Sequence, residues 1–130
     1  MRKIVFFLII IFLTSCGSVV KLPVSPVVPA AELTVKKKQD RNNNTKLEVK
    51  AKNLSGADRL VPPKHNYSVW IVTKEGKYVN LGRLQVDKKL RGKLKAVTPF
   101  GVSELIVTAE NEGGLTYPRG TQITYVKFKD

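Results

Sequence analysis

The single sulfhydryl of this chain belongs to Cys16, which follows one aliphatic and two small residues, Leu13, Thr14 and Ser15. A thiol can carry a diacylglyceryl group through a thioether bond, and small side chains before it let a peptidase reach the backbone. Cleavage before Cys16 would free its amine for a further acyl chain. Two or three acyl chains give stable anchoring where one chain gives only marginal binding. These four residues therefore predict a covalent lipid anchor at Cys16.

The residues before Cys16 have the proportions of a cleaved signal peptide, spanning 1–15. Met1, Arg2 and Lys3 form a positive start, and residues 4–13 are apolar and uncharged. An apolar helix of that length measures about 15 Å, half of the ~30 Å hydrocarbon core of a bilayer. With Leu13 to Cys16, this segment resembles the lipobox leader of bacterial lipoproteins. In such lipoproteins, Gly17 rather than Asp after the cysteine implies an outer-membrane location, with the domain facing the periplasm. A short uncleaved membrane anchor is the alternative to a signal peptide.

Composition limits the remaining function classes. At 130 residues the chain has room for one domain, and its one cysteine excludes disulfide frameworks and cysteine-based zinc sites. The formal charge is +13; removing Arg2 and Lys3 leaves 21 basic against 10 acidic residues, a net charge of +11. Such a balance would suggest nucleic acid in a cytosolic protein. Export argues against it, so no nucleic acid is expected, and no cofactor beyond the lipid on Cys16.

Residues 16–30 are expected to form the lipidated cysteine and an extended linker. Pro23, Pro26 and Pro29 stand at every third position, which is the period of a polyproline II helix. In that conformation the fourteen residues 17–30, at about 3.1 Å each, would reach about 40 Å. Proline-rich segments also serve as ligands for partner domains, but the Val and Ser residues between these prolines favour a spacer.

Residues 31–130 alternate between apolar and polar side chains, as in half-buried β-strands. Turn-forming stretches rich in Gly, Pro, Asn and Asp separate the strands. The pattern predicts an all-β domain, an antiparallel immunoglobulin-like β-sandwich of about seven or eight strands. The alternating segments are 33–36, 46–52, 93–96 and 104–110.

Two further segments are apolar on both faces. In residues 67–73, Tyr67, Val69 and Ile71 share one face and Trp70 and Val72 the other, which is typical of a covered, central strand. The sequence does not say which face meets the main core. Residues 121–128 are similarly ambiguous, and a bulge between Tyr125 and Val126 would resolve them.

Residues 67–120 contain several ordered landmarks: Tyr67, Trp70, Val72, Gly76, Lys77, residues 80–82, Gly92, residues 98–100 and residues 105–110. Together they resemble the C-terminal domain of anti-sigma-K factors. That resemblance implies an extracytoplasmic β-sandwich and an accessory role in an anti-sigma-factor-like envelope signalling system. It does not imply sigma-factor inhibition, because a signal peptide and lipobox stand where that family has a cytoplasmic domain and a transmembrane helix.

Some residues of the sequence could be combined into a catalytic or metal site, but none of them stands in a recognisable motif. His65 is the only histidine, and a triad with Ser68 and Asp58 would have no nucleophile elbow. A metal site at His65 would need ligands that do not occur nearby at a known spacing. A wall-polymer hydrolase would need paired carboxylates, for which the candidates are Glu104, Glu110 and Glu112. We expect these acids to be solvated and the protein not to be an enzyme.

Lysines gather on what would be the polar faces of two strands. Lys36 to Lys38, Lys88, Lys89 and Arg91 add to this charge. One interpretation is that the lysines only solvate the surface and discourage pairing of sheet edges. The other is attraction to lipid head groups, lipopolysaccharide or cell-wall polymers, worth about 1 kcal/mol per residue near a charged membrane. The predicted basic surface consists of Lys46, Lys50, Lys52, Lys93 and Lys95.

Overall fold

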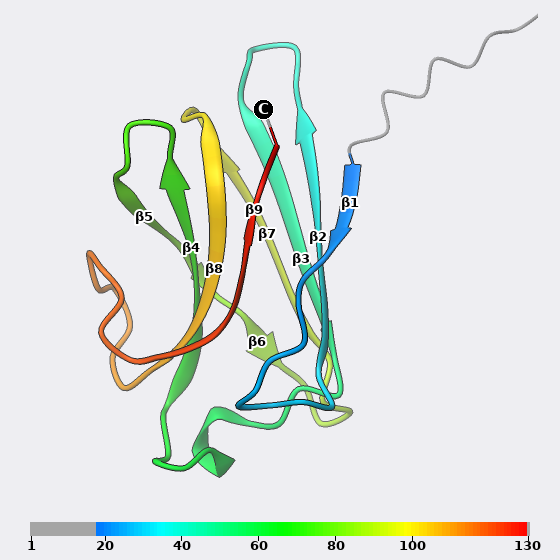
Figure 1. The fold of residues 1–130 in the computed structure, drawn as a ribbon, viewed down its shortest axis with the longest axis vertical. Coiled ribbons are helices and arrows are strands. Elements are labelled where there is room, and N and C mark those ends of the chain that lie inside the picture. Colours follow the sequence, from blue (N-terminus) through cyan, green and yellow to red (C-terminus); the bar gives the residue numbers. More distant parts are fainter. Residues whose placement is uncertain (1–17, 130) are drawn as a thin grey trace, which may run out of the picture.

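The computed structural model describes residues 18–129, which form two antiparallel sheets of five and four strands (Figure 1). The five-stranded sheet has the order β1 (Ser18–Lys21), β2 (Glu32–Gln39), β3 (Thr45–Lys52), β7 (Gly92–Thr98) and β6 (Gln85–Val86). The four-stranded sheet has the order β5 (Tyr78–Arg83), β4 (Asn66–Thr73), β8 (Val102–Glu110) and β9 (Thr121–Lys127).

The all-β prediction is confirmed, with nine strands in the described residues. The count exceeds the expected seven or eight because β1 lies in the predicted linker and β6 is only two residues long. One short 3-10 helix, η1 (Ala57–Arg59), precedes β4. Within residues 18–129, no helix has the length and apolarity needed to cross a bilayer.

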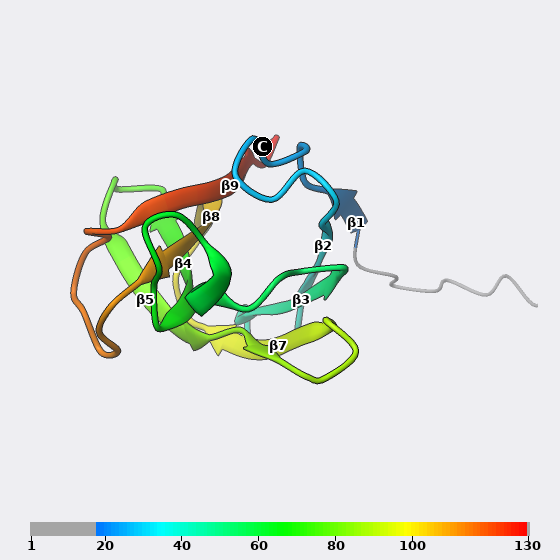
Figure 2. The ribbon, with the colours of Figure 1, turned by 90° about the horizontal axis from the view of Figure 1, so that it is seen from below.

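The main core lies between the two sheets, which face each other when the molecule is seen from below (Figure 2). The period of two produces this core, because alternate side chains of a strand point to the same face. Leu47, Val49 and Ala51 of β3 are buried, whereas the residues between them are more exposed. On the opposite sheet, the inward residues are Tyr67, Val69 and Ile71 of β4 and Leu105, Val107 and Ala109 of β8.

The second face of β4 is covered as well, by a separate small cluster. Trp70 and Val72 pack with Ile106 of β8 and with Leu115 from the loop between β8 and β9. Trp70 has no exposed surface. The structure therefore answers what the sequence left open: Tyr67, Val69 and Ile71 face the main core, and Trp70 and Val72 face the loop.

The bulge expected between Tyr125 and Val126 is instead located earlier in β9. Val107 pairs with Thr124 and Thr108 pairs with Gln122, so Ile123 is the extra residue of β9. Both Ile123 and Thr124 are buried. With the bulge at this position, the Thr124 hydroxyl donates a hydrogen bond to the carbonyl oxygen of Pro23 at 2.8 Å.

The prediction of an extended linker over residues 16–30 is wrong for residues 18–30. β1 pairs with β2 over its whole length, and every third residue after it is buried: Leu22, Ser25, Val28 and Ala31. The Ser25 hydroxyl oxygen accepts hydrogen bonds from the backbone N–H groups of Val27 and Val28, both at 3.1 Å. Burial thus repeats every third residue, as the prolines do. The residues before the prolines fill the open side of the core, and the prolines themselves face solvent.

Candidate functional site: a lysine face on the five-stranded sheet

The outer face of the five-stranded sheet carries a concentration of lysines, which we call the lysine face. Cross-strand register assigns its members, because direct partners in a sheet point to the same side. Two carboxylates, Glu32 and Glu48, share this face with eight lysines of the described residues. The lysines are Lys21 of β1, Lys36 and Lys38 of β2, Lys46, Lys50 and Lys52 of β3, and Lys93 and Lys95 of β7.

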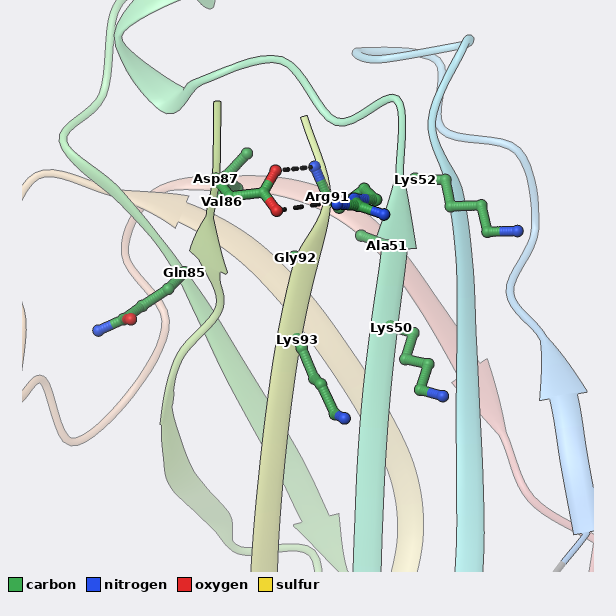
Figure 3. Close-up of a pocket in the computed structure, with 9 residues that line it drawn as sticks. All are labelled: Lys50, Ala51, Lys52, Gln85, Val86, Asp87, Arg91, Gly92 and Lys93. Atoms are coloured by element: carbon green, nitrogen blue, oxygen red, sulfur yellow. Dashed lines mark hydrogen bonds and ion pairs between the residues drawn. The ribbon is translucent and has the colours of Figure 1, made fainter. Parts of the chain in front are cut away.

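Two pairs of these lysines are direct cross-strand partners. Lys38 of β2 stands opposite Lys46 of β3, and Lys50 of β3 stands opposite Lys93 of β7. Figure 3 shows Lys50 and Lys93 on neighbouring strands with their side chains running in the same direction. Directly opposed residues have Cβ atoms about 5 Å apart, and like-charged side chains on such a pair are destabilising. The fold therefore places positive charges together at some cost in stability.

Glu48 lies in the middle of this face and offsets part of the charge. Its carboxylate oxygens lie 3.2 Å from Lys50 Nζ and 3.7 Å from Lys95 Nζ. The hydrogen bond from Lys50 lowers the pKa of Glu48 below its usual 4.5, and the charges of Lys50, Lys93 and Lys95 lower it further, against a raising effect of desolvation. Glu48 thus stays ionised under mildly acidic conditions and holds two of the lysines in place.

The turn between β6 and β7 closes one end of the lysine face. Asp87 Oδ1 accepts backbone hydrogen bonds from Lys89 at 2.9 Å and from Arg91 at 3.0 Å, and its Oδ2 lies 3.6 Å from Arg91 Nε. These backbone hydrogen bonds, Arg91 first, lower the pKa of Asp87 below its usual 3.8. Beside this turn is an open pocket of about 500 Å³ (Figure 3). Its lining includes Lys50, Lys52, Arg91 and Lys93.

A second hollow, of about 430 Å³, lies toward the other end of the face. Lys36, Lys38, Lys46 and Lys95 contribute to its lining, together with Val97 of β7. Val97 is the direct partner of Lys46 and is 58% exposed. Val19 of β1, the partner of Lys36, is 64% exposed on the same face. Exposed apolar side chains are therefore interspersed with the lysines.

Strand alternation divides the run Lys36 to Lys38. Lys36 and Lys38 point outward, whereas Lys37 turns between the sheets, where its Nζ lies 3.5 Å from the carbonyl oxygen of Val102 and 4.7 Å from the centre of the Phe128 ring. Lys21 was missed at the sequence level because β1 was assigned to the linker. The signal that could have found it is the alternation of Val20 and Leu22 with Lys21, which continues into the β1–β2 pairing.

The structure places Ser68 apart from the other two residues from which a triad could be written. Asp58 and His65 both line a pocket of about 420 Å³ near η1, where His65 Nδ1 lies 2.9 Å from the carbonyl oxygen of Asn111. Ser68 lines a different pocket, and its hydroxyl donates to Asn66 Oδ1 at 3.2 Å. No nucleophile–base pair forms among these residues, and residues 18–129 contain no cluster of three or more potential metal ligands.

The three acidic residues near β8 also differ in their surroundings. Glu104 lies 3.7 Å from Lys127 Nζ, whereas Glu110 stands six residues further along the strand, about 20 Å away. The expectation of solvated acids is wrong for Glu110, which is only 1% exposed. Thr108 Oγ1 donates to Glu110 Oε2 at 2.6 Å, and the backbone N–H of Arg119 donates to the same carboxylate at 3.3 Å. Glu110 thus fixes the loop between β8 and β9 over Trp70.

Leu13, Thr14, Ser15 and Cys16 lie outside the described residues, so lipidation at Cys16 stays a prediction. No protein-family model matches the chain, and no curated protein matches it. The resemblance to the anti-sigma-K C-terminal domain accordingly stays a prediction too.

Proposed function

We propose that this protein is a non-enzymatic interaction module of the bacterial cell envelope, anchored by lipid at Cys16, which binds an anionic envelope component through its lysine face. The outer membrane, with the domain facing the periplasm, is the expected location. One observation carries the binding proposal: like-charged lysines stand directly opposite each other in the middle of a sheet.

The position of these lysines favours binding over mere protection of the sheet edges. Edge protection places charges on the outermost strands, where unpaired backbone groups are exposed. Here β3 is the central strand of five, and β7 is paired on its other side by β6 at Gly92 and Lys93. Surfaces that only need solubility usually intersperse both signs of charge, whereas the lysine face has eight lysines against Glu32 and Glu48. A partner with repeated negative charges would relieve this repulsion.

The strand order supports the finer proposal of an immunoglobulin-like sandwich. In such folds, strands A, B, E and D form one sheet and C, F and G the other. If β2 is strand A, the sheet orders β2-β3-β7-β6 and β5-β4-β8-β9 read as A-B-E-D and C′-C-F-G. β1 then extends the first sheet by one strand.

Binding is tested with the full chain, purified from membranes in mild detergent and titrated with inorganic polyphosphate. The variant replaces Lys36, Lys46 and Lys93 by Gln, and leaves Lys50 and Lys95 paired with Glu48. At about 1 kcal/mol per lysine near a charged surface, the affinity should fall about a hundredfold. The matched control removes three exposed charges elsewhere, with Arg59, Lys77 and Lys129 replaced by Gln. Equal losses in the two variants would contradict the proposal.

The anchor is tested separately by Cys16→Ala. This variant should leave the membrane fraction after a wash in high salt, which also removes electrostatic attachment. A Cys16→Ala protein that still sediments with washed membranes would show that the anchor lies elsewhere.

A further inference from the structure

We infer that the lysine face docks on the bilayer that holds the protein's own lipid anchor, with anionic lipid head groups as its ligand. The inference rests on the proposed function, and names the partner within it. It follows from where the first strand begins, from which sheet that strand belongs to, and from the side chains on that sheet.

The chain between the anchor and the folded domain is too short to act as a spacer. β1 begins at Ser18, two residues after Cys16. An extended chain spans at most about 3.6 Å per residue, so two residues of chain can span at most about 7 Å. The sequence pattern predicted a reach of about 40 Å. The upper limit set by chain geometry is shorter than the Debye length of ~8 Å at physiological salt.

β1 cannot easily lengthen that link by detaching. It pairs with β2 from Ser18 to Lys21, and Val20 packs against the main core. Beyond it, the N–H of Leu22 donates to the carbonyl oxygen of Leu33 at 2.9 Å. Releasing β1 would break these hydrogen bonds and expose Leu22, which is 3% exposed.

β1 is also the edge strand of the sheet that carries the lysine face, as Figure 1 shows. Ser18 pairs with Lys37, so its neighbours on β2 are Lys36 and Lys38, both on the lysine face. The end of the face nearest to Cys16 is thus the end with the hollow lined by Lys36, Lys38, Lys46 and Lys95. Anchoring at Cys16 would bring this end to the membrane surface first.

The side chains on this end suit the interface of a bilayer. Interfacial surfaces combine basic residues, which attract anionic head groups, with apolar residues that insert below them. Val19 and Val97 are more than half exposed and stand in register with Lys36 and Lys46. A soluble wall polymer would use the lysines but would leave the valines without a partner, so the bilayer is the occupant that accounts for both.

The test places a polarity-sensitive fluorophore on the full, lipid-modified chain in vesicles of phosphatidylcholine with or without phosphatidylglycerol. Val97→Cys labels the lysine face, and Tyr78→Cys labels β5, at the far edge of the other sheet; both positions are exposed. The Val97→Cys label should enter a less polar environment only in vesicles with phosphatidylglycerol, and high salt should reverse the change. Replacing Lys36, Lys46 and Lys93 by Gln should lower the docking equilibrium constant about a hundredfold.

The outcomes separate this inference from the proposed function. If the Val97→Cys label stays in water on both vesicles while polyphosphate binding still depends on the lysines, docking on the bilayer is wrong and a polymer is the partner. A change at Tyr78→Cys in place of Val97→Cys would overturn the inference as well, because the opposite sheet would then face the bilayer. Loss of lysine-dependent binding to both polyphosphate and vesicles would refute the proposed function itself.

Discussion

Lys50 of β3 and Lys93 of β7 are direct cross-strand partners in the middle of the five-stranded sheet. Lys50 forms an ion pair with Glu48 at 3.2 Å, and Glu48 also pairs with Lys95 at 3.7 Å, whereas Lys93 acts on Glu48 only through its charge. An acidic residue at position 93 would have made a favourable pair with Lys50 instead. Surfaces that lower stability in this way are typical of sites kept for function.

Lys93→Glu should therefore separate stability from binding. The substitution turns a like-charge pair into an opposite-charge pair, so the free energy of unfolding should rise by up to about 1 kcal/mol. Polyphosphate affinity should fall about thirtyfold, because the face loses one positive charge and gains a negative one. Urea denaturation and titration of the same protein preparation measure the two effects. Lys77→Glu, in the β4–β5 turn, is the matched control; a similar loss of affinity there would argue against the lysine face.

The ion pairs of Glu48 predict an acid-sensitive part of stability. The pKa of this carboxyl group is lowered in the folded state, chiefly by the hydrogen bond from Lys50. Its contribution is therefore complete above the usual value of 4.5 and is lost as the pH falls through the lower folded value. Denaturation midpoints measured across that range should fall less steeply for Glu48→Gln than for the unmodified protein. Equal slopes would mean that the Glu48 pairs do not contribute.

Tyr67 predicts a loss of stability at the other end of the pH scale. Burial, assisted by the charge of Asp58, raises its pKa from 10.0 to about 12, and its hydroxyl donates to the carbonyl oxygen of Ser55. Between these two values the unfolded chain ionises first, so stability falls as the pH rises. Tyr67→Phe should flatten this decline and cost about 1 kcal/mol at neutral pH through the lost hydrogen bond. An unchanged alkaline decline in Tyr67→Phe would assign it to other groups.

The loop over Trp70 should depend on the hydroxyl of Thr108. The indole N–H of Trp70 donates to Thr108 Oγ1 at 2.9 Å, and that oxygen donates to the buried Glu110. Thr108→Val keeps the shape but leaves two buried polar groups without this partner, which should cost at least about 2 kcal/mol. The fluorescence of Trp70, the chain's one tryptophan, reports the change during urea denaturation. Thr108→Ser retains the hydroxyl and should be the milder variant; the reverse order would contradict this account.

Alternation along the strands is enough to predict the all-β class and the side of β3 and of β7 that holds the lysines. The pattern is local, since the period of two assigns Lys46, Lys50 and Lys52 to one face of β3 whatever β3 pairs with. It could not say that Lys50 would stand opposite Lys93, because register depends on how distant segments meet. Nor could it choose a face for Trp70, since both faces of β4 are apolar and the covering Leu115 lies 45 positions further along.

The sequence by itself determined the all-β class, the inward residues of the alternating strands and the lysines of β3 and β7, since each depends on short-range alternation. Tertiary structure alone decided that residues 18–30 belong to the folded domain. Their prolines repeat every third position, which fits an extended spacer, yet Leu22 and Val28 fill an open side of the core that exists only once the two sheets have assembled. Burial of those side chains brings the domain to within two residues of Cys16, and no local pattern carries that information.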